Sequence, residues 1–172
     1  MNSKILLTSF ATWLPHQKSN SSDDLLIEIA KLESSSLTFL KQLPVDVPKA
    51  SRLVIAKIAE LQPDSIICCG MAESRTKLTV ESCATCGNAF IKTPVNLEKL
   101  VVGADGIEIS HDAGKFVCEG LYYEVLKYLQ EHNLNTPCIF VHVPVLTEEN
   151  SPEVVRVFWE VIQRMASLVS LF

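Results

Sequence analysis

Three side chains in this sequence have the types that thiol catalysis requires: Cys118, His142 and Glu81. A cysteine nucleophile works with an imidazole that holds and moves its proton, and with a third group that orients the imidazole. The chain offers one candidate for each of these roles. Spacing alone does not bring the three together, so the elements that carry them decide whether this chemistry is available.

Cys118 lies at the expected start of a helix. The polar turn of residues 111–114 precedes it. Free backbone N–H groups and the positive end of the helix dipole favour a thiolate at such a position. Cys118 is therefore a candidate nucleophile, and the alternative is a small buried residue that closes the start of the helix. The apolar residues that recur at helical spacing behind it are Leu121, Tyr122, Val125, Leu126 and Leu129.

His142 and Glu81 each have a second, purely structural interpretation. His142 lies near the carboxyl end of the apolar run 138–143, where α/β sheets place their ligand sites. A core histidine bonded to the backbone fits the same pattern. Glu81 lies in residues 77–83, which alternate as a strand does, and an acid on a strand is usually exposed to solvent. Neither residue is assigned a role by its own position.

The six cysteines are expected to be thiols, because the chain shows no signal-peptide pattern. Cys83 and Cys86 form a C-x-x-C pair, which leaves a redox or zinc protein open as one hypothesis. A second C-x-x-C at zinc-ribbon spacing is absent from the sequence, and Cys68 and Cys69 end an apolar run where burial explains them. We therefore predict no metal site and no cofactor.

Composition and charge narrow the class of protein. Of the 172 residues, 48% are hydrophobic and 20% are charged, which is typical of a globular domain. The net charge of −5 and the lack of a basic run argue against a nucleic-acid partner. No apolar run approaches the roughly 20 residues that cross a bilayer, so we expect no membrane association. We expect a single cytoplasmic domain over residues 1–172.

Apolar runs alternate with amphipathic helix patterns along the chain. Strands are expected at residues 4–9, 37–43, 65–69, 77–83 and 138–143. Helices are expected at residues 22–31, near 48–61 with Leu53 on the inner face, from Cys118, and from Ser151 onward. Residues 87–106 are weakly patterned and are expected to form a loop and a short strand. This alternation predicts a three-layer α/β/α sandwich around a mostly parallel, mixed sheet.

Several segments resemble, in chain order, the conserved blocks of a known family. They are residues 6–10, residues 43–50, residues 70–75 with Glu81, residues 110–126 around Cys118, and residues 140–144 around His142. The family is pyroglutamyl peptidase I, peptidase family C15, whose members are cysteine peptidases that remove an N-terminal pyroglutamate. The resemblance spans nearly the whole chain and implies a phosphorylase/hydrolase-like fold.

The resemblance also implies roles for particular residues. Cys118 would be the nucleophile, His142 the general acid and base, and Glu81 the group that orients the imidazole. The implied partner is a peptide or small amide with an N-terminal pyroglutamate, hydrolysed through a thioester without a cofactor. An apolar pocket suits this substrate because the pyrrolidone ring is uncharged. The implied substrate-binding residues are Phe10, Trp13, Gly70, Met71, Phe116 and Val117.

The chain departs from the family pattern in the loops around this site. Ser9 replaces a glycine, which would close off a backbone conformation with positive φ. Glu73-Ser74 replaces a pair of glycines, and Glu119 replaces the asparagine that usually follows the nucleophile. An acid beside a thiol opposes the thiolate, so the pKa of Cys118 is expected to be less depressed than in the family.

The largest departure concerns the arginine that the family uses to stabilise the oxyanion. Its position falls on Ile91, and Lys92 beside it is the expected substitute. A single preorganised donor of this kind contributes roughly 3–4 kcal/mol to the barrier. These changes motivate the main alternative, a binding or regulatory homologue with the same fold and weakened catalysis. The family resemblance also makes a homo-oligomer an expectation, with Phe158 or Trp159 available for an interface.

Overall fold

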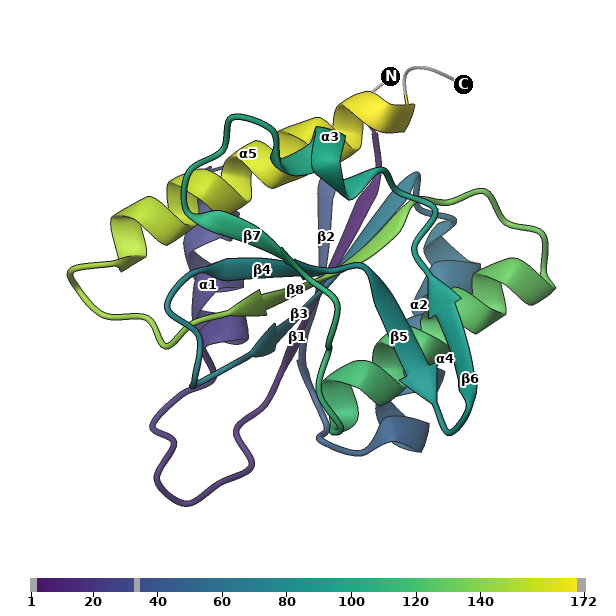
Figure 1. Cartoon of the computed structure of the whole chain (residues 1–172), viewed down its shortest axis with the longest axis horizontal. Coiled ribbons are helices and arrows are strands. Elements are labelled where there is room, and N and C mark those ends of the chain that lie inside the picture. The colour runs from purple at the N-terminus through teal and green to yellow at the C-terminus, as the bar shows by residue number, and fades with distance from the viewer. Residues whose placement is uncertain (1–2, 33–34, 170–172) are drawn as a thin grey trace.

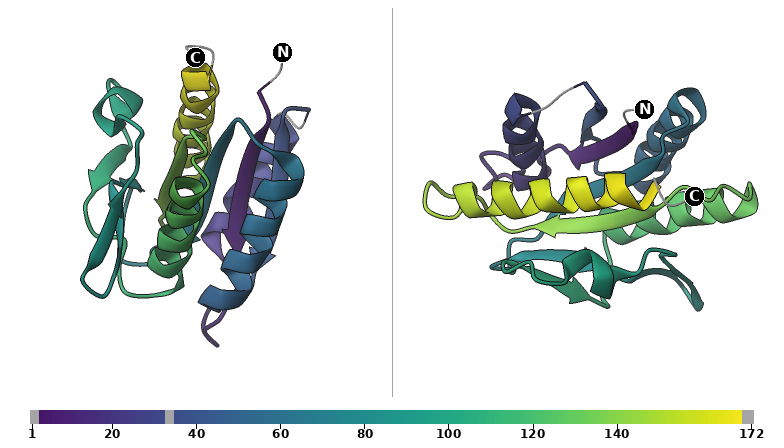
Figure 2. Two further views of the ribbon diagram at one scale, coloured as in Figure 1. Left: turned by 90° about the vertical axis from the view of Figure 1, so that its right-hand side faces the viewer. Right: turned by 90° about the horizontal axis from the view of Figure 1, so that it is seen from above.

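A six-stranded sheet divides the protein into two helical layers (Figures 1 and 2). The computed structural model describes residues 3–32 and 35–169. The strands lie in the order β2-β1-β3-β8-β4-β7. Their bounds are β1 Ile5–Phe10, β2 Leu37–Leu43, β3 Ser65–Met71, β4 Leu78–Glu81, β7 Ile107–Ser110 and β8 Cys138–Val143.

The sheet is parallel except where β4 meets β8. The pairs β1–β2, β1–β3, β3–β8 and β4–β7 are parallel, and β4–β8 is antiparallel. A separate two-stranded hairpin, β5 (Cys83–Cys86) and β6 (Ala89–Lys92), packs against α4. The predicted class, a three-layer α/β/α sandwich with a mostly parallel sheet, is confirmed.

The helices follow the alternation of side chains along the strands. Helices α1 (Ser21–Leu32) and α5 (Ser151–Val169) cover one face, and α2 (Val47–Leu61) and α4 (Val117–Glu131) cover the other (Figure 1). The short helix α3 (Leu97–Val101) lies beside β7 and α5. None of the described helices is long and apolar enough to cross a membrane.

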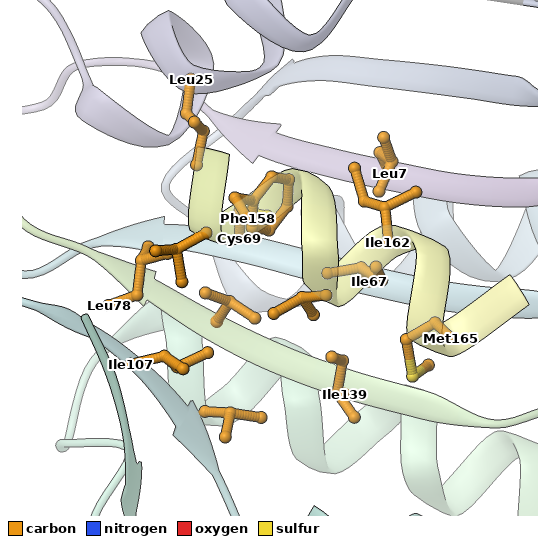
Figure 3. Close-up of a cluster of buried hydrophobic side chains, with 14 of the residues drawn as sticks. Leu7, Leu25, Ile67, Cys69, Leu78, Ile107, Ile139, Phe158, Ile162 and Met165 are labelled. Carbon is orange, nitrogen blue, oxygen red and sulfur yellow. The ribbon is translucent and has the colours of Figure 1, made fainter. Parts of the chain in front are cut away.

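Odd-numbered residues of the central strands form the core under α1 and α5. Figure 3 shows Phe158, Ile162 and Met165 of α5 directed at Ile67 and Ile139 of the sheet. Phe158 is completely buried, and Trp159 is partly buried against the same cluster. Phe158 therefore belongs to the core and is not available for an interface.

Even-numbered residues of the same strands face α2 and α4. Leu6, Cys68 and Phe140 are fully buried there, with Leu121 of α4 packed on them. Continuing this parity toward the strand ends leads to Gly70 on β3 and His142 on β8. The candidate catalytic residues therefore lie where this second core reaches the carboxyl edge of the sheet.

The structure corrects three expectations about the elements. Leu53 is 48% exposed, and the buried face of α2 is formed by Ala50, Ser51, Val54 and Ile58 instead. The weakly patterned segment contains the helix α3, and the strand β7 follows it. The strand expected over residues 77–83 ends at Glu81, because the chain then turns out of the sheet and Cys83 begins the hairpin.

Candidate active site

Glu81 and His142 form a hydrogen-bonded pair on neighbouring strands. Thr79 lies opposite His142 in the antiparallel β4–β8 ladder. Glu81, two residues further along β4, therefore points to the same face of the sheet. Its Oε1 lies 2.7 Å from Nδ1 of His142. Glu81 is fully buried and His142 is 5% exposed, so this acid is not the solvated strand residue that its position alone would suggest.

Cys118 reaches the same place from the first turn of α4. A Cβ atom added to Gly70 would overlap the Sγ atom of Cys118, so the sulfur rests directly on the backbone of β3. Gly70 is the register partner of His142 on β8. Because neighbouring strands lie about 4.8 Å apart, the thiol and the imidazole are neighbours on one face of the sheet. The structure thus brings together all three predicted catalytic residues.

The surroundings of Cys118 favour the neutral form of its thiol. Burial, reinforced by the negative charge of Glu81 and by Cys68, raises the pKa of Cys118 to about 12, and a hydrogen bond from its own backbone N–H opposes this rise. The expectation that the helix N-terminus depresses this pKa is wrong, because the loss of hydration outweighs the dipole. Glu119 is not among the causes of this rise in pKa, and its carboxylate accepts the backbone N–H of Thr85 at 3.2 Å.

Arg75 completes the site and was not among the predicted residues. Its Nη1 lies 3.0 Å from Oε1 of Glu81 and also contacts the hydroxyl of Thr79. Its Nη2 donates to the carbonyl of Asp112 at 2.8 Å. A buried carboxylate requires a compensating cation, and this requirement is the signal that would have pointed to the arginine six residues before Glu81.

A cavity of about 730 Å³ opens beside Cys118 and His142. Trp13 and Phe116 stand at its mouth, with ring centroids 5.9 Å apart and exposed fractions of 51% and 70%. Gly70 lies beneath the sulfur of Cys118 and does not line the cavity. The other predicted substrate-binding residues all line it: Phe10, Trp13, Met71, Phe116 and Val117.

Ser9 makes contacts that the family's glycine lacks. Its hydroxyl donates to Oδ1 of Asp23 at 2.7 Å and accepts the backbone N–H of Gln42 at 3.2 Å. Among the described residues other than glycine, positive φ occurs at Gln42, Gln62 and Asn133, and not at Ser9. Ser9 thus does not adopt the positive-φ conformation that a glycine would allow, and the serine ties β1 to α1 and β2.

Glu73, in the place of a glycine, connects two loops at the cavity mouth. Its Oε1 accepts from Nε2 of Gln17 at 2.7 Å, and its Oε2 lies 3.0 Å from Nε2 of His16. These bonds, the one from Gln17 first, hold the pKa of Glu73 below its ordinary value. The loop of residues 11–19, which carries Trp13, is thereby fastened to the loop that follows β3.

The position of the family's oxyanion arginine contributes nothing to the cavity. Ile91 lies on β6 and packs partly buried against the core under α2 and α4. The Nζ of Lys92 lies 5.9 Å from the centroid of the Phe90 ring, and neither residue lines the cavity. The structure thus gives no support to Lys92 as a substitute for the arginine.

Cys83 and Cys86 lie on one strand, three residues apart. Residues at this spacing point to opposite faces of a strand, which argues against a shared metal ion or a disulfide between them. Within residues 3–32 and 35–169, no group of three or more potential metal ligands gathers. Cys83 approaches the carbonyl of His111, while Cys86 is exposed.

Comparison with known proteins places the chain in a family. The family model of pyroglutamyl peptidase matches residues 89–155, which include Cys118 and His142. The pyrrolidone-carboxylate peptidase of Streptococcus pneumoniae strain 70585 is 30% identical over 176 residues, covering 85% of this chain and 80% of that protein. The chain belongs to the pyroglutamyl peptidase family. The enzyme of the same name from Bacillus mycoides is 32% identical over 137 residues, which span 64% of each chain.

Solved structures of the pyroglutamyl peptidase family share the fold. Pyroglutamyl peptidase I from Bacillus amyloliquefaciens superposes with a TM-score of 0.83 at 21% identity, covering 96% of both chains. Pyrrolidone carboxyl peptidase from Thermococcus litoralis gives a TM-score of 0.82 at 16% identity, covering 98% of this chain and 94% of that one. The architecture is therefore retained where most of the sequence has changed.

Proposed function

We propose that this protein is a cysteine peptidase that hydrolyses the amide bond after an N-terminal pyroglutamyl residue. The observation that carries the proposal is the meeting of Cys118 with the Glu81–His142 pair at one cavity. Its membership of a family whose relatives are named pyrrolidone-carboxylate peptidases supports the choice of substrate. A homo-oligomer stays a prediction.

His142 would act through the nitrogen that faces away from Glu81. Because Nδ1 lies against the carboxylate, the carboxylate favours the tautomer with the proton on Nδ1, which leaves Nε2 free to accept the thiol proton. Sulfur then attacks the pyroglutamyl carbonyl, and a tetrahedral oxyanion forms. The C–N bond breaks, and the departing amine takes its proton from Nε2. A water, activated by the same nitrogen, hydrolyses the thioester to pyroglutamate and regenerates the thiol.

The neutral thiol determines how this attack must proceed. With the pKa of Cys118 raised to about 12, a preformed thiolate is scarce at neutral pH. Proton transfer to His142 therefore accompanies formation of the C–S bond, as in general-base catalysis by serine peptidases. The negative charge passes directly to the carbonyl oxygen and is not held on the partly buried sulfur.

The first turn of α4 supplies donors for that oxyanion. Phe116, the N-cap residue, makes no side-chain hydrogen bond to the turn. The leading N–H groups of a helix have no partner within the helix and favour a negative charge. Since Ile91 offers no donor, we infer that these backbone N–H groups stabilise the oxyanion without the arginine that assists them in the family.

The lining of the cavity favours a lactam over a charged residue. Phe10, Met71 and Val117 present carbon and sulfur surface to a bound ring. A free N-terminal glutamate would bring both an ammonium and a carboxylate into this surface and would lose their hydration. An uncharged pyrrolidone ring avoids that loss, so the pocket discriminates by desolvation.

The alternative is a homologue that binds pyroglutamyl ligands with little turnover. Two observations favour it, the raised pKa of Cys118 and the replacement of the oxyanion arginine by Ile91. Such a protein would still protect Cys118 from alkylation when a pyroglutamyl peptide occupies the cavity, but it would release no product.

The test is hydrolysis of pyroglutamyl-7-amino-4-methylcoumarin. We expect fluorophore release by the wild type, its loss in Cys118→Ala, and its retention in Cys86→Ala, which changes an exposed thiol outside the cavity. Turnover that survives Cys118→Ala would refute the mechanism. Absence of turnover together with pyroglutamyl protection of Cys118 would favour the binding homologue.

A further inference from the structure

One guanidinium connects three parts of the site. Arg75 contacts Glu81 and Thr79 on β4 through Nη1, and the carbonyl of Asp112 through Nη2. Asp112 lies in the turn that leads from β7 to Cys118, and the side chain of Asp112 closes this turn by accepting the N–H of Gly114 at 2.9 Å. The group that orients the imidazole and the turn that delivers the nucleophile are therefore held by the same side chain.

Among the described residues, the charged groups in direct contact with the Glu81 carboxylate are Arg75 and His142. Arg75 and His142 both lie against Oε1, at 3.0 and 2.7 Å. Oε2 is buried without a hydrogen-bond partner. The ionisable groups Cys118 and Tyr122 lie near enough to feel the carboxylate, and the Tyr122 hydroxyl donates to the backbone carbonyl of Glu81 at 3.0 Å. Arg75 is thus a permanent cation that compensates a fully buried acid.

We propose that Arg75 is a positioning residue with two separable roles: its charge compensates the charge of the buried Glu81 beside His142, and its planar fork fixes the nucleophile turn against β4. The inference rests on the proposed function of the same site. Burial of a carboxylate without a compensating charge is costly, so the pair with His142 depends on this arginine. The fork matters because donors on two nitrogens reach opposite sides of the site, which a lysine ammonium cannot do.

Removal of the charge changes the proton held by His142. With Arg75 present, the negative charge of Glu81 is shared between a guanidinium and an imidazole on one oxygen. Without it, the carboxylate is balanced only by His142, which then retains a second proton to higher pH. His142 must be neutral to accept the thiol proton, so the acid limb of the pH–rate profile moves upward.

Three variants separate the two roles. Arg75→Gln removes the charge but keeps a donor near Glu81, Arg75→Lys keeps the charge but loses the fork, and Arg156→Met removes an arginine paired with Glu160 on the exposed side of α5. The measurement is kcat/KM for the pyroglutamyl coumarin amide as a function of pH, with thermal unfolding recorded for each variant.

For Arg75→Gln we expect kcat/KM at neutral pH to fall about 10- to 100-fold, by analogy with the loss caused by removing a residue that orients a metal-binding side chain. We also expect its acid limb to rise by about one pH unit. Arg75→Lys should keep the limb of the wild type while losing rate, and Arg156→Met should match the wild type. An unchanged limb in a folded Arg75→Gln, or equal limbs in the Gln and Lys variants, overturns the proposal.

Two further outcomes are informative. A fourth variant, Arg75→Met, covers the case in which Arg75→Gln does not fold. If both variants fail to fold while Arg75→Lys folds, the positive charge at residue 75 is needed to bury Glu81, which supports the role of charge compensation. If the wild type shows no turnover, the proposed function fails, and the inference is tested by alkylation of Cys118, followed by peptide mass spectrometry. The thiol should then react more slowly in Arg75→Gln than in the wild type, and an equal rate would overturn the inference.

Discussion

Gly70 is the residue whose replacement tests the geometry of the site most directly. Its Cα lies under the thiol, and a Cβ at this position would overlap Sγ of Cys118 and stand 2.9 Å from Cζ of Phe140. Phe140 is completely buried, so it has little room to move aside. Gly70→Ala must therefore displace the sulfur, the ring, or both.

The displacement affects stability and activity to different extents. Overpacking a core by one methyl group costs about 1–3 kcal/mol, which lowers the melting temperature by roughly 2–12 °C for a domain of this size. A nucleophile moved by about 1 Å loses roughly 100-fold in rate. We therefore expect Gly70→Ala to remain folded at 25 °C while kcat/KM falls about 100-fold.

Gly120→Ala is the matched control. The added Cβ would stand 2.5 Å from Cγ2 of Val47 on α2, a partly buried residue that lines the cavity, and its three nearest atoms all belong to Val47 and none to Cys118. We expect a comparable loss of melting temperature with a much smaller loss of kcat/KM. The assay is coumarin release beside thermal unfolding. Full activity in Gly70→Ala, or equal losses of activity in both variants, would show that the sulfur does not rest on β3.

Two further predictions concern proton equilibria. With the pKa of Cys118 raised to about 12, the rate of its alkylation by iodoacetamide should rise about tenfold per pH unit from pH 7 to 10. The alkylation rate of a free cysteine peptide levels off above about pH 8.5. A plateau of the Cys118 rate near neutrality would contradict the raised pKa. The same shift favours the folded state at pH values below the ordinary thiol pKa of 9.0, and this contribution is lost as pH rises toward 12. Glu73→Ala should raise KM about two- to fivefold with kcat retained, as expected for an exposed contact, because the loop of residues 11–19 loses its bonds through His16 and Gln17. Since the pKa of Glu73 is held below 4.5, the KM of the wild type should stay low above that pH and rise as Glu73 becomes protonated at lower pH. A KM that changes neither in Glu73→Ala nor at low pH would rule out a role of Glu73 in holding the loop.

The strands under the two cores are predictable from the sequence because their signal is local. Residues 65–69 and 138–143 are continuous apolar runs, as expected for strands covered on both faces. The strand β7 has four residues and α3 has five, too few for a period to be established. Their positions depend on pairing with β4 and on packing against α5, which are contacts between distant segments.

The catalytic residues required a different kind of information. Glu81 and His142 meet only because β4 runs antiparallel to β8, and their own segments do not encode that pairing. The resemblance to a family supplied it. Arg75 was missed because its contacts with Glu81 and Asp112 exist only once the loop after β3 has folded back over β4.

The error about Cys118 has a physical origin. A helix start is visible in the sequence, and its dipole favours a thiolate by an amount that falls off within one turn. The depth of the sulfur is not visible, because it is set by Gly70 and Phe140 on strands far along the chain. Desolvation is the larger effect on this partly buried thiol. The extent of desolvation, which the sequence does not reveal, therefore decides the direction of the pKa shift.

The protonated thiol and the buried acid form one arrangement. The charge of Glu81 prepares His142 to accept a proton, and the same charge helps to keep the proton on Cys118. A neutral thiol is a poor nucleophile toward oxidants and alkylating agents. We infer that the thiol is unreactive in the resting site. It becomes nucleophilic only when a substrate carbonyl beside the first turn of α4 can accept the negative charge. The selectivity of the site would then arise at the bond-forming step as well as in the fit of the lactam ring.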